Sequence, residues 1–238
     1  MLNKSNNIKI LSNLLEIEYG KKYLKPSFDP LSELIATILS QNTSDHNSHR
    51  AFRNLKNSFK NWEELKDAPL KKVVQSIKIG GLEKIKAMRI KNILVQIYKE
   101  RRNFNLSFLK KWETEEIREY LNKFKGVGDK TIACVLLFSL GRPVLPVDTH
   151  ILRVSKRLGL LSVKSDSEKA HQILQKIIPT NVIYPFHLNL IEHGRKICKA
   201  RIPLCGDCVL LKICKFKDKH KYIQKRSQDA KSEPFKRG

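Results

Sequence analysis

Acidic residues are scarce in this sequence. The chain of 238 residues has 23 Asp and Glu against 47 Lys and Arg, which gives a formal net charge of +24 at pH 7. A positive field of this size favours a polyanionic partner. Nucleic acid is the usual partner of that kind, and an anionic membrane surface is the alternative.

Long apolar runs are also missing. No stretch has the apolar length of a transmembrane helix, and the opening MLNKSNNIKI lacks the apolar core of a signal peptide. We therefore expect an intracellular, cytoplasmic protein that does not associate with membranes, and we expect a monomer. Cysteine is sparse as well. Four of the five cysteines gather near the C-terminus, unlike the disulfide framework of a secreted protein.

Strand-like alternation of apolar and polar residues is not found, and neither is an internal repeat. Helical patterns occur instead. Asp29-Pro30 is a favourable helix start, and the apolar residues that follow have helical spacing. We therefore predict an all-α protein, long enough to bury a core in one or two domains.

A glycine turn joins two of the predicted helices. A short amphipathic helix over residues 114–124 is interrupted by Gly126, Val127 and Gly128, and a second helix follows over residues 129–140. Glycine permits backbone angles that other residues resist, and the free N–H groups of the second helix favour a bound phosphate. The Gly-x-Gly pattern alone is short, and it fits an ordinary helix–helix turn equally well.

Lys130 and Asp148 add chemistry to this region. Lys130 occupies the first turn of the second helix, where the helix dipole opposes an ammonium. A neutral amine is a nucleophile suited to Schiff-base formation, although a phosphate contact would also explain the lysine. Asp148 is placed to cap the next helix. A carboxylate there could also stabilise a cationic sugar, as oxocarbenium-like transition states require. His150 is expected to be a packed residue.

The cysteine cluster predicts a metal centre. Six, two and five residues separate Cys198, Cys205, Cys208 and Cys214. Four thiolates at this density fit either a tetrahedral zinc site or an iron–sulfur cluster. Basic residues surround the cysteines and suggest a loop that faces phosphates; they include Lys199 and Arg201.

Together these motifs resemble the endonuclease III family of DNA glycosylases, within the helix-hairpin-helix superfamily. The stretch FKGVGDKT over 124–131 is similar to the family's hairpin with its lysine. The stretch PVDTH over 146–150 is similar to its aspartate motif, and the cysteine spacing is similar to that of its [4Fe–4S] loop. The likeness covers about residues 28–214.

The resemblance implies a bifunctional DNA glycosylase and AP lyase of base excision repair that acts on oxidised pyrimidines in damaged double-stranded DNA. Lys130 would attack C1′, displace the base and form an imine, and elimination would then nick the strand on the 3′ side. Asp148 would assist deprotonation and stabilise the cationic sugar. Cys198, Cys205, Cys208 and Cys214 would hold a [4Fe–4S] cluster.

The resemblance also implies DNA contacts. Enzymes of this kind take the target base out of the stack. Leu82 and the pair Gln41-Asn42 would fill the gap. The family pattern has a glutamine at the position that aligns with Asn42, and here the glutamine comes one residue earlier. The gap-filling role therefore stays open between Gln41 and Asn42.

The resemblance implies two helical domains. Residues 29–141 would form a helical barrel domain that contains the hairpin over 114–140. Residues 1–28 and 142–214 would form a second domain with the cluster loop over 198–214. Residues 215–238 read as a basic, disordered tail.

Two alternatives remain from sequence. The same lyase chemistry could act on another lesion, such as an oxidised purine or an AP site alone. A non-catalytic DNA-binding protein with a structural metal would also fit the charge and the hairpin, but it leaves the pairing of Lys130 with Asp148 unexplained.

Overall fold

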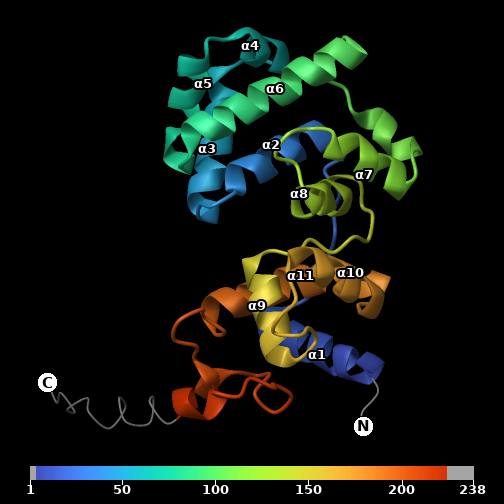
Figure 1. Ribbon diagram of the computed structural model, residues 1–238, viewed down its shortest axis with the longest axis vertical. Helices are drawn as coiled ribbons and strands as arrows, with labels where there is room; N and C mark the ends of the chain where they lie inside the picture. Colours follow the sequence, from blue (N-terminus) through green and yellow to red (C-terminus); the bar gives the residue numbers. More distant parts are fainter. Residues whose placement is uncertain (1–3, 224–238) are drawn as a thin grey trace, which may run out of the picture. The chain divides into compact units, whose positions relative to one another are not determined.

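The computed structural model describes residues 4–223 (Figure 1). Helices dominate this part of the chain, and none of its residues forms a strand. The prediction of an all-α protein is therefore confirmed. Among residues 4–223 there is also no helix with the length and apolarity that a bilayer span would need.

The chain divides into two compact units. Residues 25–142 form the central unit, and the described residues on either side, 4–24 and 143–223, form the terminal unit. Residues 25–28, assigned from sequence to the other domain, belong to the central unit. The reason is local: Ser27 N donates to Phe138 O at 3.0 Å and Phe28 N donates to Ser139 O at 3.1 Å.

The central unit is built around α2 (Pro30–Ser40). Asp29 caps this helix by accepting from Ser32 N at 3.0 Å, and Pro30 occupies its first position. Seven of its eleven residues are buried, because α3, α6 and α8 pack around it. The other elements of this unit are α3 (Asp45–Ser58), α4 (Trp62–Asp67), α5 (Leu70–Ile77), η1 (Lys78–Gly80), α6 (Glu83–Arg101), η2 (Ser107–Lys111), α7 (Thr114–Asn122), α8 (Asp129–Cys134) and η3 (Val135–Ser139).

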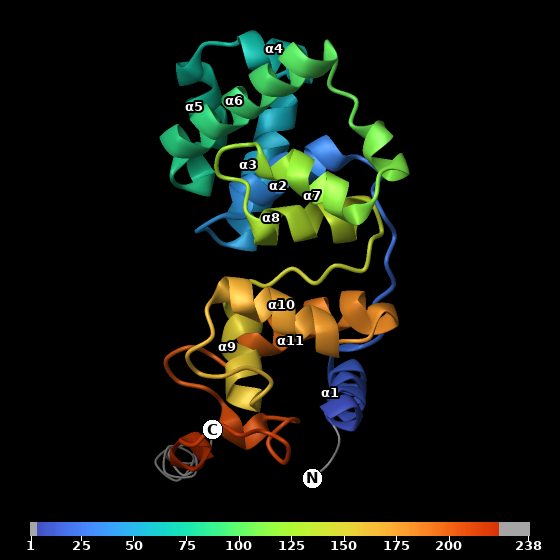
Figure 2. The same cartoon turned by 45° about the vertical axis from the view of Figure 1, so that its right-hand side comes forward.

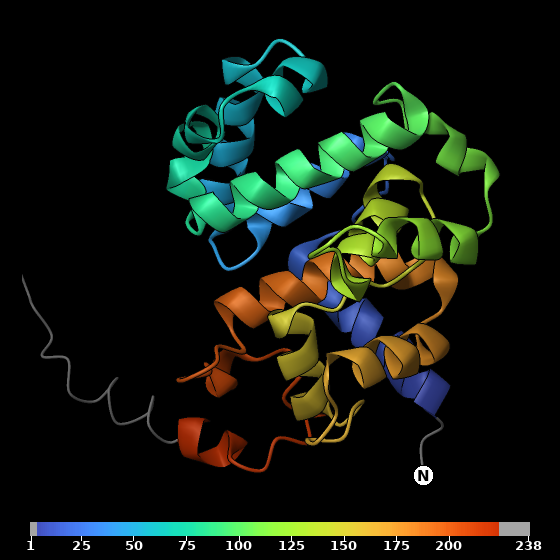
Figure 3. The ribbon, with the colours of Figure 1, turned by 45° about the horizontal axis from the view of Figure 1, so that its top comes forward.

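The long helix α6 runs beside α2 in the central unit (Figure 3). It carries a lysine that is buried: Lys86 is 1% exposed. Its Nζ donates to Leu39 O at the end of α2 and to Gly80 O in η1, both at 2.8 Å. Because a buried ammonium is costly without such partners, this lysine ties the two chain segments together. Burial lowers the pKa of Lys86.

The helix predicted over 129–140 changes its hydrogen bonding midway. Residues 129–134 are α-helical, whereas Val135–Ser139 form a π-helical turn. After that turn, Arg142 N donates to Leu136 O at 2.8 Å. The apolar pattern predicted the helical path of the chain but not the wider turn, since side-chain periodicity does not report which carbonyl each N–H selects.

The terminal unit is also helical and has its own core. Ile8, Leu11 and Leu15 of the first helix are at most 1% exposed, and this helix packs on α10 and α11 while α9 packs on α11 (Figure 2). Its helices are α1 (Lys4–Tyr19), α9 (Thr149–Leu158), α10 (Ser167–Ile177), η4 (Thr180–Val182), α11 (Ile183–Lys196) and η5 (Cys205–Asp207).

The predicted disordered tail is corrected in its first part. Lys219 Nζ donates to Leu211 O at 3.2 Å and to Cys214 O at 2.6 Å, and Phe216 stacks on Tyr222 with ring centroids 6.2 Å apart. Residues 215–223 are therefore packed onto the cysteine loop. The rest of the predicted tail, residues 224–238, lies outside the described residues.

Candidate active site and cysteine pocket

The hairpin between α7 and α8 is anchored by two buried side chains. Phe124 is 1% exposed and Val127 is 4% exposed, and Val127 N donates to Phe124 O at 3.0 Å. Gly126 and Gly128 stay at the surface. The Val127 side chain therefore anchors the turn. Only the backbone of Val127 remains available for contact with a ligand.

Only one of the two glycines has a conformation that requires glycine. Gly126 has φ +87°, whereas Gly128 has an ordinary extended backbone and caps α8. Arg89 of α6 lies directly against Gly126, so that a Cβ there would come 2.6 Å from Arg89 Nε. Helix α6 and the hairpin thus fit together with no space for a side chain on Gly126.

We expect Gly126→Ala to destabilise the protein by about 1–2 kcal/mol from the left-handed backbone alone, with the Arg89 clash in addition. Gly128→Ala is the matched control, because its Cβ would meet no atom within 4 Å. Thermal unfolding of both variants tests this. Adding Arg89→Ala to Gly126→Ala should recover the part of the loss due to the clash. Equal melting temperatures for the two single variants would contradict the fit.

Lys130 lies half-buried in the first turn of α8. Its positive charge acts on the carboxyl of Glu33 in α2. Burial is the main reason why the pKa of Glu33 is raised, and the negative charge of Asp29 also raises it. The Thr37 hydroxyl and the Lys130 ammonium lower it, but by less. The half-buried carboxyl of Glu33 and the amine of Lys130, the lysine that follows the hairpin, therefore both belong to the central unit.

Asp148 caps α9, as its position predicts. Its Oδ1 accepts from Ile151 N at 2.7 Å. Nearby, His150 packs against Gly194 of α11 and its Nδ1 lies 3.1 Å from Arg153 Nη2. Burial lowers the pKa of His150. The negative charge of Asp148 has the opposite effect and raises it. Asp148 belongs to the terminal unit and Lys130 to the central unit.

The loop after α2 places Gln41 and Asn42 in different surroundings. Arg89 Nη1 donates to Gln41 Oε1 at 2.8 Å, and Gln41 Nε2 lies 3.5 Å from both Gly126 O and Thr131 Oγ1. Since arginine only donates, the amide oxygen must face Arg89. The Gln41 side chain is therefore directed at the hairpin.

Asn42 and Leu82 are presented differently. Both have left-handed backbones, with φ +52° and +51°, and Leu82 is 48% exposed. Asn42 is exposed, and its side chain forms no hydrogen bond within residues 4–223. A bulky apolar residue in this conformation is a backbone outlier, which is characteristic of functional sites. Leu82 is thus an exposed residue rather than a packed hydrophobic staple.

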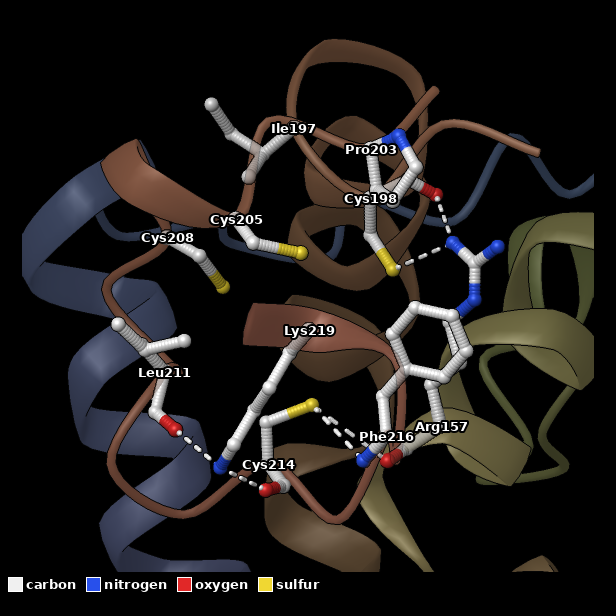
Figure 4. Close-up of a pocket in the computed structure, with 10 residues that line it drawn as sticks. All are labelled: Arg157, Ile197, Cys198, Pro203, Cys205, Cys208, Leu211, Cys214, Phe216 and Lys219. Carbon is white, nitrogen blue, oxygen red and sulfur yellow. Dashed lines mark hydrogen bonds between the residues drawn. The ribbon is translucent and has the colours of Figure 1, made fainter. Parts of the chain in front are cut away.

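Four cysteines face one small cavity in the terminal unit (Figure 4). Burial raises the pKa of Cys208 to about 12, and burial is also the first cause that raises the pKa of Cys205 and Cys214. A cationic group in the cavity would therefore be needed to hold these sulfurs as thiolates. The remaining lining residues are Arg157, Ile197, Pro203, Leu211, Phe216 and Lys219.

Arg157 organises the cysteine loop. Its Nη1 lies 3.3 Å from Cys198 Sγ and donates to Lys199 O at 2.7 Å, while its Nη2 donates to Ala200 O at 3.0 Å. Its guanidinium also covers the Phe216 ring at 4.6 Å. Lys199 and Arg201 are exposed. Within residues 4–223, no three or more His, Cys, Asp or Glu side chains are arranged to hold one metal ion.

Sequence reasoning missed four residues that shape these sites. They are Glu33, Lys86, Arg89 and Arg157. The spacing of four between Glu33 and Thr37 on an otherwise apolar helix was the one available pattern. No pattern pointed to Lys86, Arg89 or Arg157, because a chain with 47 Lys and Arg residues does not distinguish any single basic residue by its type.

Comparison with known proteins gives consistent matches. Residues 35–180 match the sequence model described as "HhH-GPD superfamily base excision DNA repair protein". An Arabidopsis thaliana protein named as a candidate DNA glycosylase is 38% identical over 191 residues, which span 76% of this chain and 65% of that protein. Endonuclease III of Thermotoga maritima is 36% identical over 191 residues, spanning 79% of this chain and 84% of the relative.

A solved structure also matches. It is a trapped covalent intermediate of endonuclease III with DNA, described as an estranged-adenine complex. Its TM-score is 0.77 at 29% identity, with 95% of this chain and 100% of that chain covered.

Proposed function

The chain belongs to the HhH-GPD superfamily of base excision DNA repair proteins and is a DNA glycosylase and AP lyase, and we propose that it removes oxidised pyrimidines from damaged duplex DNA. The observation that supports the glycosylase–lyase chemistry in this proposal is the position of Lys130, whereas the oxidised-pyrimidine substrate follows from the similarity to endonuclease III. Lys130 follows an anchored glycine hairpin and lies half-buried in the first turn of α8. An amine presented in this way is suited to nucleophilic catalysis.

Lys130 is the nucleophile in this proposal. Its neutral amine forms a bond to C1′ of the damaged nucleoside, and the base leaves with the electron pair of the glycosidic bond. The attached nitrogen then loses a proton and the C1′–O4′ bond of the sugar ring opens, with a proton going to O4′, which converts the adduct into an imine. The imine makes the 2′ hydrogens acidic. Loss of one of them then expels the 3′ phosphate by β-elimination, which nicks the strand.

Asp148 stabilises the cationic sugar and assists proton transfer. Its side chain is fixed by the hydrogen bond to Ile151 N, so the carboxylate is held in one orientation. A fixed carboxylate beside developing positive charge lowers the barrier more than a mobile one, because less reorganisation is needed.

The exposed loop residues contact DNA. Asn42 and Leu82 enter the duplex at the flipped nucleotide, whereas Gln41 stays tied to Arg89 and supports the hairpin. The backbone of Gly126, Val127 and Gly128 faces the phosphates. Lys199 and Arg201 add exposed positive charge, in line with the overall charge of +24.

The cysteine pocket holds a [4Fe–4S] cluster. Four thiols line one cavity, and their spacing of six, two and five residues is similar to that of the family's [4Fe–4S] loop. Raised thiol pKa values mean that the four sulfurs need a positive centre to be thiolates. Cys198, Cys205, Cys208 and Cys214 would bind the cluster. When bound, it crosslinks the loop and presents Lys199 and Arg201.

Borohydride trapping tests the proposal. Wild-type protein is incubated with a duplex that carries one thymine glycol and, separately, with a duplex that carries one AP site. We expect covalent trapping on both. Trapping on the AP site alone would keep the lyase and remove the oxidised-pyrimidine substrate; oxidised purines would then be the next lesions to assay. Trapping on neither would favour a DNA-binding protein without this chemistry.

A further inference from the structure

Two loops of the central unit each present one exposed residue in a left-handed backbone. Asn42 follows the end of α2 with φ +52°, and Leu82 precedes α6 with φ +51°. Such angles are uncommon for residues other than glycine, and for a bulky residue such as leucine they mark a genuine outlier. A conformation of this kind persists only where the surrounding structure holds it in place.

The buried side chain of Lys86 contacts both segments. Its Nζ donates to Leu39 O and to Gly80 O, both at 2.8 Å. Leu39 comes three residues before Asn42. Gly80 comes two residues before Leu82, whose carbonyl oxygen accepts from the Lys86 backbone N–H at 3.0 Å. The end of α2 and the start of α6 therefore meet at one ammonium (Figure 3).

Both carbonyls lie where a helix ends. Leu39 is in the last turn of α2 and Gly80 is the last residue of η1, and the final C=O groups of a helix have no partner within that helix. Gly80 is buried, and a Cβ there would come 3.1 Å from Ala51 Cβ of α3. Without the ammonium, two carbonyls in the interior would lose their donor, which costs stability. Lys86 therefore fixes the ends of both helices.

Packing alone does not require a lysine at this position. Burial of a charge costs free energy, and an apolar side chain of similar volume fills such a space without that cost. An ammonium has three donors that point in different directions, so one group can hold two carbonyls from separate segments. Lys86 thus sets a fixed separation between the loops of Asn42 and Leu82.

We infer that Lys86 is a positioning residue that joins the loops of Asn42 and Leu82 into one rigid unit, so that both side chains enter the DNA together. The inference rests on the proposed function, in which these two residues enter the duplex at the flipped nucleotide. Lys86 is buried and does not itself touch DNA. Because one ammonium holds both loops, the entropy of ordering them is lost on folding and not on DNA binding.

The test is a binding titration on a duplex that carries a tetrahydrofuran analogue of an AP site with 2-aminopurine opposite it. The analogue forms no imine, and 2-aminopurine brightens when a side chain enters the gap and unstacks it, so the titration reports insertion and not catalysis. Wild type, Asn42→Ala, Leu82→Ala and the double variant are compared, each with and without Lys86→Met. Methionine fills similar space without donating a hydrogen bond.

Lys86→Met should weaken binding by about tenfold when Asn42 and Leu82 are both present. Asn42→Ala and Leu82→Ala should each cost less affinity when they are combined with Lys86→Met. In the protein that lacks both side chains, Lys86→Met should change the affinity by less than about twofold, because no inserted side chain remains to be positioned. A lysine that only supports the fold would cost the same affinity in every background.

Lys84→Met is the matched control. Lys84 is exposed in the first turn of α6, so this variant removes an equal charge without removing the two hydrogen bonds. Its effect on affinity should not depend on Asn42 or Leu82. A cooperative thermal transition shows that each variant folds. If Lys86→Met does not fold, Lys86→Gln provides the same comparison, because its shorter side chain keeps an amide donor in the interior.

Two results would overturn the inference. Lys86→Met could leave the affinity unchanged or lower it by the same factor in every background, or its effect could depend on only one of the two side chains. Either result leaves the proposed function intact. Failure of the proposed function is recognised separately, because wild-type protein would then form no borohydride adduct on either the thymine glycol duplex or the AP-site duplex.

Discussion

Lys130→Gln is expected to lower covalent trapping on the AP-site duplex by about 10³-fold or more, because an amide cannot form an imine. DNA binding should persist. The substitution removes one of 47 basic residues, so the salt dependence of affinity should change by at most about one phosphate contact. Trapping gels and a binding titration at two salt concentrations measure both quantities.

The matched control for this variant is Lys125→Gln. Lys125 is exposed in the same hairpin, and its loss removes the same charge without removing the proposed nucleophile. It should trap at close to the wild-type extent with slightly weaker binding. If Lys130→Gln still forms the borohydride adduct, another amine is the nucleophile and the role of Lys130 is wrong.

Cys208→Ser is expected to remove iron and acid-labile sulfide and to lower the free energy of unfolding by about 4 kcal/mol or more, as loss of a structural metal does. Cys208 faces the cavity, and burial raises its pKa to about 12, so it needs a positive centre to be a thiolate. Iron and sulfide analysis with thermal unfolding measures the effect. Wild-type protein should be yellow-brown.

Cys134→Ala provides the comparison for this experiment. Cys134 is 5% exposed in α8 of the central unit, far from the pocket in sequence. Cys134→Ala should retain its full iron content, because Cys134 does not line the pocket. Zinc without iron in the wild-type protein, or full iron in Cys208→Ser, would refute the cluster.

The helices and motifs could be predicted because they rest on local patterns. Apolar spacing defined α2, the Asp29-Pro30 pair defined its start, and the glycines marked the hairpin before α8. These features depend on backbone geometry and caps, which nearby residues determine. The cysteine spacing was equally local, and the four side chains do share one cavity.

The contacts between distant segments could not be predicted. Arg89 forms a hydrogen bond with Gln41, which is 48 positions away in the sequence, and Lys86 forms one with Leu39, which is 47 positions away. Such pairs depend on how α6 packs on α2, and one basic residue looks like another in sequence. The choice between Gln41 and Asn42 as the residue that fills the gap was open for the same reason. The hydrogen bond from Arg89 to Gln41 supports the proposal that Asn42 has this role.

Helix α9 has a consequence for how the terminal unit responds to damage. Asp148 caps the first turn of this helix. Near the other end, Arg157 donates hydrogen bonds to the carbonyl oxygens of Lys199 and Ala200 in the cysteine loop. Ten residues of helix are about 15 Å long and move as one stiff rod. The proposed cluster pocket and the proposed acid–base residue Asp148 are therefore connected through one helix. We expect that loss of the cluster would also change the position of the Asp148 carboxylate.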